Sequence, residues 1–261
     1  MSLSSQSNTL SNSLRTFSAT NSLLTNSIPS EKSLESAVAI AIKYANDIKP
    51  GGKIYFRKTI SLSELKTMIG IVPNAKDSRT YIQPDGGFVF WEYMGKHVPI
   101  LISEDKHQGT NDNRFNDGLG RQSTGNAIER AGKNINAVKP LFMDKYNIYP
   151  YALFCAGCDF HSSETISTRI EGINCFKGNH YLEVTSENDD EKNEQYIVDN
   201  ILMNIDIKKW HGEFAASTFI KAHKWNELPN GASKWNVNER SMILKYIVKQ
   251  AMVYYDKLFN K

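Results

Sequence analysis

The chain of 261 residues carries 31 basic and 28 acidic side chains, a formal net charge of +3. This balance is too mild to indicate nucleic-acid binding, and a hydrophobic content of 40% excludes general disorder because it can form a core. No apolar run approaches the roughly 18 residues that cross a membrane. Three cysteines, an odd number, argue against a disulfide framework and for a reducing cytoplasm. The start lacks the basic cluster and apolar run of a secretory signal.

Residues 1–30 differ in composition from the rest of the chain. They hold ten Ser, four Thr and four Asn, and Arg15 is the only charged residue before Glu31. Such a segment has too little apolar surface to offset the entropy lost on ordering, which predicts a flexible arm. A transit peptide would also be rich in Ser and poor in acids, but it would carry several Arg residues.

Two helices are predicted after this arm. Apolar residues recur at helical spacing from Leu34 to Ala45, which predicts a helix over residues 33–47. Ser61 and Glu64 have the spacing of a capping box, which predicts the start of a second, short helix.

The middle of the chain predicts an α/β core. Two apolar runs, 88–92 and 98–103, predict a hairpin with its loop at 93–96, and their two apolar faces indicate strands inside a sheet. A helix is predicted to begin at Asn126 and a buried strand to follow over 149–156. Strand, helix and strand in this order predict a crossover between two parallel strands.

Later elements are less distinct. Pro140 is expected to end or kink the helix that begins at Asn126. Residues 166–169 and 181–184 are candidate strands, and 238–259 is predicted to form a long C-terminal helix with Val253 among its buried positions.

Two acids and a lysine flank the predicted hairpin. If Glu92 lies opposite His97, counting along the ladder places Asp85 directly opposite Glu104, with Cβ atoms roughly 5 Å apart. Lys106 follows Glu104 by two residues, so both side chains lie on one face. The sequence therefore predicts that two carboxylates and one ammonium group converge at the end of this hairpin.

These three groups suit the metal-assisted hydrolysis of a phosphodiester. Two carboxylates at this spacing repel each other unless a cation lies between them, and hard oxygen ligands suit Mg²⁺. Lys106 is placed to hold or deprotonate the attacking water, or to neutralise charge that develops on phosphorus. Asp105 is predicted to point to the opposite face. The pattern is short, and a turn aspartate beside an exposed ion pair is the plainer alternative.

The surrounding residues make the pattern specific. Four segments carry this information: QPDGG at 83–87, ExKHQG at 104–109, GNAIER at 125–130 and KNI at 133–135. They closely resemble the EcoRI family of type II restriction endonucleases, a branch of the PD-(D/E)xK nucleases. The resemblance covers about residues 53–185. It implies a restriction-endonuclease-like α/β fold with a central mixed β-sheet flanked by helices. It also implies one nuclease domain over residues 31–261, after the arm.

The resemblance assigns roles to individual residues. Asp85 and Glu104 match the metal-binding acids, Lys106 matches the catalytic lysine, and the backbone carbonyl of Asp105 matches a further metal ligand. Asp105 itself replaces a small apolar residue of the relatives. The residues that match the DNA-recognition positions of the family are Gln108, Gly125, Asn126, Ala127, Glu129 and Arg130.

The resemblance also implies a function and partners. It indicates a homodimeric, Mg²⁺-dependent enzyme of the bacterial cytoplasm that cuts both strands of a short palindromic DNA site. The site is expected to contain AATT and to be cut with 5′ overhangs. Thr124 offers no bidentate pairing to a purine, so the outer base pair is expected to be read loosely or elsewhere. A cognate DNA methyltransferase is expected in the same system, without direct contact.

The sequence leaves alternatives for the function, for a zinc site and for two basic segments. Two function alternatives are another nuclease of this superfamily, acting in repair or on DNA structure, and a DNA-binding protein without catalysis. A zinc site would have to use Cys155, Cys158, Cys175 and His161, but their spacing fits no common zinc knuckle, so buried or free thiols are expected. The basic and aromatic segments 208–210 and 221–225 either contact the DNA backbone or are ordinary surface.

Overall fold

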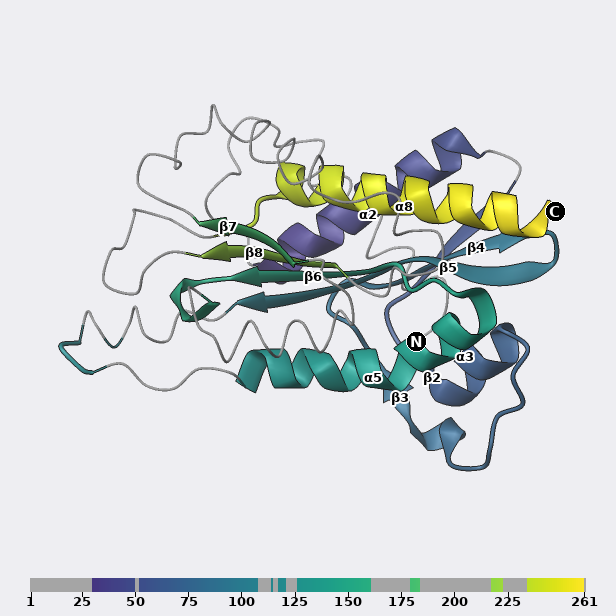
Figure 1. The fold of residues 1–261 in the computed structure, drawn as a ribbon, viewed down its shortest axis with the longest axis horizontal. Coiled ribbons are helices and arrows are strands. Elements are labelled where there is room, and N and C mark those ends of the chain that lie inside the picture. Colours follow the sequence, from purple (N-terminus) through teal and green to yellow (C-terminus); the bar gives the residue numbers. More distant parts are fainter. Residues whose placement is uncertain are drawn as a thin grey trace.

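The computed structural model describes residues 30–49, 52–107, 114, 117–120, 126–160, 179–183, 217–222 and 234–260. These residues form a central six-stranded sheet with the strand order β1-β4-β5-β6-β8-β7, and helices lie on both of its faces (Figure 1). The predicted α/β class with a mixed, helix-flanked sheet is confirmed. The predicted arm, apart from its last residue Ser30, lies outside the described residues.

The elements have the following bounds. The strands of the central sheet are β1 (Lys53–Arg57), β4 (Gly87–Tyr93), β5 (Lys96–His107), β6 (Tyr151–Ala156), β7 (Asn179–Glu183) and β8 (Ser217–Ala222). A smaller sheet pairs β2 (Ile60–Ser61) with β3 (Tyr81–Ile82). The helices are α2 (Ser30–Ile48), α3 (Leu62–Met68), α5 (Asn126–Tyr146) and α8 (Val237–Phe259), with short 3-10 turns η1 (Asp77–Arg79) and η2 (Cys158–Phe160).

The helices form two layers around the sheet. Helices α2 and α8 cover one face and pack against each other and against β5, whereas α5 covers the other face (Figure 1). Leu34 and Val38 of α2 and Ile243 and Ile247 of α8 are fully buried in the core between these layers. In the part of the chain that the structure describes, no helix combines the length and apolar content needed to cross a membrane.

The strand directions place one end of α5 beside the end of β5. Strands β1, β4 and β5 are antiparallel neighbours, whereas β5, β6, β8 and β7 run parallel. The predicted parallel crossover is therefore confirmed, with α5 connecting β5 to β6. Because α5 returns the chain to the start of a parallel strand, its N-terminus lies at the carboxyl end of β5. Ligand sites of open α/β sheets occur at this end of the strands.

The hairpin of β4 and β5 contains an extra residue. Glu92 lies opposite His97, as predicted. Between Val89 and Phe90 the register shifts by one position, which leaves Ile100 of β5 without a partner and makes a β-bulge. Every pair beyond this bulge is therefore displaced by one residue from the register that the sequence predicts.

A turn follows where β4 begins. The ladder ends with Gly87 opposite Ser103, so the predicted pairing of Asp85 with Glu104 is wrong. The N–H of Gly87 instead donates to the carbonyl of Pro84 at 3.0 Å, and this turn carries Asp85 out of the strand. The turn compensates for the register shift that the bulge introduces. Asp85 therefore still contacts Glu104, although the two residues are not paired in the ladder.

Several other expectations can be compared with the structure. Ser61 caps α3 by accepting a hydrogen bond from the backbone of Glu64, as predicted. Pro140 does not end its helix, since α5 continues to Tyr146. Val253 is 40% exposed, so its predicted burial is wrong. Strands β1 and β8 were not predicted, and the candidate strand at 166–169 lies outside the described residues.

The turn before β4 generates a stability prediction. Gly87 has φ +71°, and a Cβ there would lie 2.7 Å from the Phe56 ring and 2.8 Å from the Arg57 carbonyl oxygen. Gly95 has a similar φ of +70°, but no described atom lies within 4 Å of its Cβ position. We expect Gly95→Ala to lower the free energy of unfolding by about 1–2 kcal/mol through backbone strain. Gly87→Ala should lose a further ~1–3 kcal/mol through the clash.

Urea denaturation of the two alanine variants measures the difference. Gly95→Ala is the matched control, since it carries the same backbone strain without the steric contact. Equal losses in both variants would show that the close approach at Gly87 is not a constraint.

Candidate active site

Asp85, Glu104 and Lys106 come together at the open end of the β4–β5 hairpin. The Nζ atom of Lys106 lies 2.6 Å from Asp85 Oδ2 and 2.6 Å from Glu104 Oε1. The backbone N–H of Asp85 donates to Glu104 Oε2 at 3.2 Å. Glu104 and Lys106 reach this point from the carboxyl half of β5, and Asp85 reaches it from the turn.

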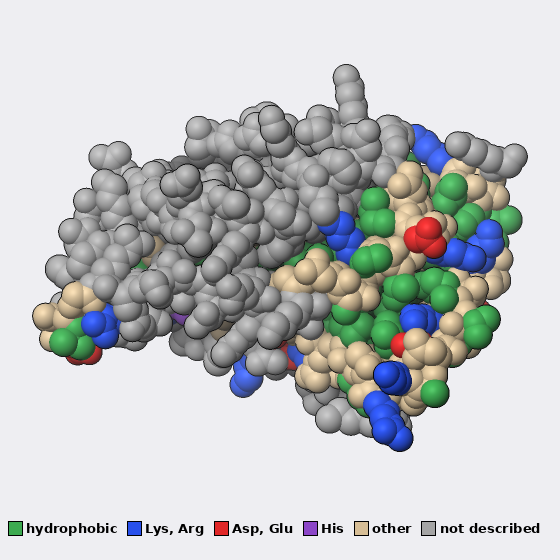
Figure 2. Space-filling view, turned by 60° about the horizontal axis from the view of Figure 1, so that its bottom comes forward, with side chains coloured by type: hydrophobic (Ala, Val, Ile, Leu, Met, Phe, Trp, Pro, Cys, Tyr) green, Lys and Arg blue, Asp and Glu red, His purple; other side chains and the backbone are tan. Residues whose placement is uncertain are grey.

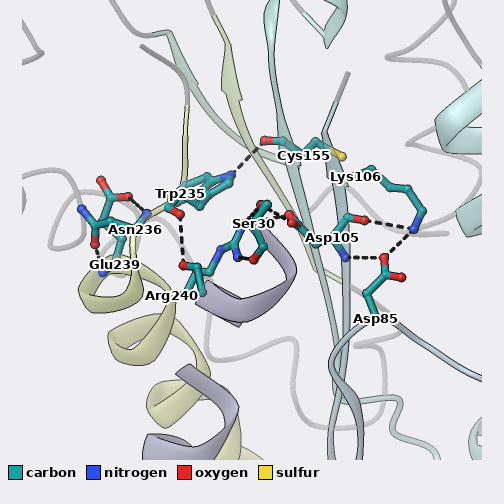
Figure 3. Close-up of polar contacts among 10 residues, drawn as sticks. Ser30, Asp85, Asp105, Lys106, Cys155, Trp235, Asn236, Glu239 and Arg240 are labelled. Carbon is teal, nitrogen blue, oxygen red and sulfur yellow. Dashed lines mark hydrogen bonds and ion pairs between the residues drawn. The ribbon is translucent and has the colours of Figure 1, made fainter. Parts of the chain in front are cut away.

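Asp105, between the two, faces the opposite side of the sheet. Its carboxylate accepts hydrogen bonds from Arg240 Nη2 at 2.9 Å and from the Ser30 hydroxyl. The predicted direction of this side chain is confirmed. Its backbone, in contrast, joins the site: the N–H donates to Asp85 Oδ2 at 3.2 Å and the carbonyl accepts from Lys106 Nζ at 3.0 Å. Figure 3 shows Asp105 between these two groups of contacts.

The electrostatics of the site follow from its burial. The side chain of Glu104 is 3% exposed and that of Lys106 is 16% exposed. Burial raises the pKa of Glu104 above its ordinary value, and Lys106 opposes this rise without cancelling it. Burial lowers the pKa of Lys106, but the charge and hydrogen bonds of Glu104 and Asp85 outweigh this, so the net shift is upward. Lys106 is therefore held in its protonated form.

The oxygen atoms around Lys106 suit a second cation. They belong to the Asp85 carboxylate, the Glu104 carboxylate and the Asp105 carbonyl, and all three contact the same ammonium group. With both acids ionised, two negative charges face one positive charge, so the site keeps a net negative charge. Hard oxygen donors of this kind suit Mg²⁺, which takes one or two carboxylates and keeps several waters. The residues present therefore fit this metal.

A larger metal cluster is not present in the described part of the chain. No group of three or more His, Cys, Asp or Glu side chains there is placed to hold a metal. Cys155 and Cys158 are buried, as expected, and burial raises the pKa of Cys155 well above its ordinary value. The other two candidate zinc ligands, His161 and Cys175, lie outside the described residues.

Two basic residues that the sequence does not predict to be part of the site, Lys58 and Arg240, lie beside it. Lys58 donates to the backbone carbonyl of Asp85 and to Glu35 Oε1, the latter at 3.1 Å, so it links the turn to α2. Arg240 binds Asp105 from α8. Neither residue belongs to a recognisable motif, and each is brought to the site only by tertiary packing. A sequence signal for them is therefore lacking.

The predicted recognition residues are only partly described. Asn126, Ala127, Glu129 and Arg130 lie in the first turns of α5. Their side chains lie outside the described part of the structure, as do Gln108 and Gly125 entirely. The N-terminus of α5 lies at the same edge of the sheet as Lys106, because α5 is the crossover from β5 to β6. Their roles in DNA recognition remain predictions.

The described part of one face carries side chains of mixed type. Figure 2 shows the side of the molecule that is lowest in Figure 1, where Lys and Arg side chains are scattered among hydrophobic ones in its described part. Lys221, from one of the two candidate DNA-contacting segments, forms an ion pair of 2.9 Å with the buried Glu239. Residues 208–210 and 223–225 of these segments lie outside the described residues.

Comparison with known proteins identifies the family. The family model described as restriction endonuclease EcoRI matches residues 25–257. No curated protein sequence matches the chain. The match spans both the motif region and the helices α2 and α8 that support it. The chain therefore belongs to the EcoRI restriction endonuclease family, whose members are type II site-specific deoxyribonucleases that bind DNA and hydrolyse it.

Proposed function

We propose that the protein is a Mg²⁺-dependent endonuclease that cuts both strands of a short palindromic DNA duplex. The observation that carries the proposal is the contact of Asp85 and Glu104 with Lys106 at the carboxyl end of β5, in a chain of this family. This geometry supplies what phosphodiester hydrolysis requires: carboxylates for a metal, and a cation beside them for the charge of the transition state.

Each member of the site has a role in this proposal. Asp85, Glu104 and the carbonyl of Asp105 would hold Mg²⁺, which supplies Lewis-acid stabilisation of charge on the scissile phosphate and activates water. Lys106 donates hydrogen bonds to the attacking water or to a phosphate oxygen and neutralises charge on phosphorus.

The recognition residues are proposed to read the central base pairs. The amide of Asn126 pairs bidentately with an adenine edge, and Arg130 donates to purine acceptors in the major groove. The free N–H groups at the start of α5 favour the approach of a phosphate. Glu129 is proposed to link the two subunits, and the remaining members of this set are Gln108, Gly125 and Ala127.

A homodimer follows from the proposed substrate. A palindrome presents two equivalent half-sites, which a protein with two-fold symmetry matches. We also propose a single nuclease domain over residues 31–261 with an arm at 1–30, and a location in the bacterial cytoplasm, which the odd number of cysteines suits. A separate DNA methyltransferase would protect host DNA.

The first test removes the three groups of the site. We expect Asp85→Asn, Glu104→Gln and Lys106→Met each to reduce the cleavage rate by at least about 10²-fold, since each removes a group that stabilises developing charge. Binding to the same DNA should remain within about tenfold, because most of the contact surface is unchanged. Single-turnover cleavage and gel-shift binding measure the two quantities.

A control variant on the same hairpin keeps this test specific. Glu92→Gln removes a carboxylate whose ion pair with Lys53 is largely exposed, at 3.5 Å, so its cleavage rate should match that of the wild type. A site variant that cuts at the normal rate would exclude that residue from the mechanism.

The second test removes the metal. A chelator should abolish cleavage, and added Mg²⁺ should restore it, because without the metal the scissile phosphate meets two carboxylates. Cleavage that persists in excess chelator would contradict the metal assignment. The same plasmid digest gives discrete bands for a site-specific enzyme, structure-dependent nicks for a repair nuclease, and no products for a protein that only binds.

The third test reads the recognition site from the products. We expect fragment ends that contain AATT with four-base 5′ extensions. Because a threonine side chain at position 124 offers no bidentate pairing, we expect the outer base pair to be degenerate, absent or read by other residues. Each missing contact of this kind removes roughly 1–3 kcal/mol of discrimination, which is enough to relax a position. Sequencing of digest ends measures this, and termini without AATT would overturn the assignment of the core.

A further inference from the structure

Arg240 is a fully buried charge directly behind the site. Its side chain is 0% exposed, and that of its partner Asp105 is 6% exposed. Besides the ion pair of 2.9 Å, its guanidinium donates to the Ser30 carbonyl at 2.6 Å and to the Ser30 hydroxyl at 2.8 Å. It also lies 5.5 Å from the centre of the Phe154 ring. The guanidinium thus connects α8 to the start of α2 and to the sheet.

Stability alone does not account for this pair. Taking an arginine and an aspartate out of water costs as much as their attraction returns, and apolar residues of similar size often stabilise a core equally well. Burial lowers the pKa of Arg240, which reflects this cost. If the Arg240–Asp105 ion pair adds little to the free energy of unfolding, its role is better explained by the groups that it orients.

Among the described residues, no strand pairs with the backbone of Asp105 on the side of β4. The ladder between β4 and β5 ends at Ser103, whereas β5 continues to pair with β6 through Asp105 and Lys106. On the open side, the N–H and the carbonyl of Asp105 contact Asp85 and Lys106 in place of a neighbouring strand. The peptide groups of Asp105 thus belong to the site. They lie where β5 has a paired strand on the β6 side but not on the β4 side.

The side chain of Asp105 supplies the missing support. It leaves the opposite face of the strand and is held there by Arg240 and Ser30 (Figure 3). A carboxylate fixed at its far end restricts rotation of its own backbone, and with it the directions of the N–H and the carbonyl.

We propose that Arg240 is a positioning residue, which acts through Asp105 to hold the Asp105 carbonyl and N–H in the orientation that the metal site requires. This inference rests on the proposed Mg²⁺ dependence. Residues that do not bind a metal themselves but hydrogen-bond to its ligands orient those ligands. Their replacement typically lowers metal affinity or activity by roughly 10–100-fold. The effect of Arg240 on metal binding should therefore exceed what its effect on folding explains.

The test compares two variants of the pair with a neighbour. Arg240→Met removes the anchor, and Asp105→Asn keeps the shape of the side chain but loses its charge. Glu239→Gln is the control, because Glu239 precedes Arg240 on the same helix and its buried ion pair with Lys221, at 2.9 Å, is separate from the site. Mn²⁺ binding is followed by electron paramagnetic resonance, Mg²⁺ dependence by cleavage, and folding by urea denaturation.

The proposal predicts a specific pattern in these measurements. Arg240→Met and Asp105→Asn should weaken Mn²⁺ binding by at least about tenfold and raise the half-saturating Mg²⁺ concentration for cleavage similarly. Both measurements are made under conditions in which urea denaturation shows each variant to be folded. Glu239→Gln should lose stability but bind Mn²⁺ within about twofold of the wild type. Normal Mn²⁺ binding by the folded Arg240→Met protein would overturn the proposal.

A double variant covers the case in which a lone buried charge prevents folding. Arg240→Met combined with Asp105→Leu removes both charges, so the core keeps its packing while the anchor is lost. It should fold and still bind Mn²⁺ weakly, and normal binding would again overturn the inference. A wild-type protein that binds no Mn²⁺ and needs no Mg²⁺ would instead contradict the proposed function on which the inference rests.

Discussion

The alternation of side chains along β5 is the constraint on which the site depends. Successive residues of a strand face opposite sides of the sheet, so Glu104 and Lys106 meet Asp85 on one side while Asp105 meets Arg240 on the other. The backbone between them is shared by both environments. The packing of α8 on one face and the candidate active site on the other therefore share one stretch of backbone.

The catalytic candidates could be predicted from sequence because they lie close together along the chain. Asp85, Glu104 and Lys106 sit at the ends of one hairpin, and the β-rich runs between them fix a short list of possible registers. The predicted register was nevertheless wrong beyond Phe90. The bulge at Ile100 was not foreseen, because both faces of this hairpin are apolar and no pattern of polar residues reveals the extra position.

The supporting residues could not be predicted because they come from distant parts of the chain. Arg240 and Ser30 are 210 positions apart in sequence, and their contact exists only because α2 and α8 pack together. A basic residue on an amphipathic helix is expected at the surface, so the burial of Arg240 runs against its pattern. Strand β8 was missed for a related reason, since its burial comes from neighbours on both sides, β6 and β7.

The bulge at Ile100 also constrains how the gene for this protein can change in length. Because Ile100 is an extra residue, removal of one residue between the hairpin turn and Ser103 can be absorbed by loss of the bulge, which keeps Ser103 opposite Gly87 and keeps the faces of the residues that follow. Insertion of one residue would instead exchange the faces of Glu104, Asp105 and Lys106 unless a second bulge formed. A library that scans single-codon changes in length along β5 should therefore lose function more sharply on insertions than on deletions.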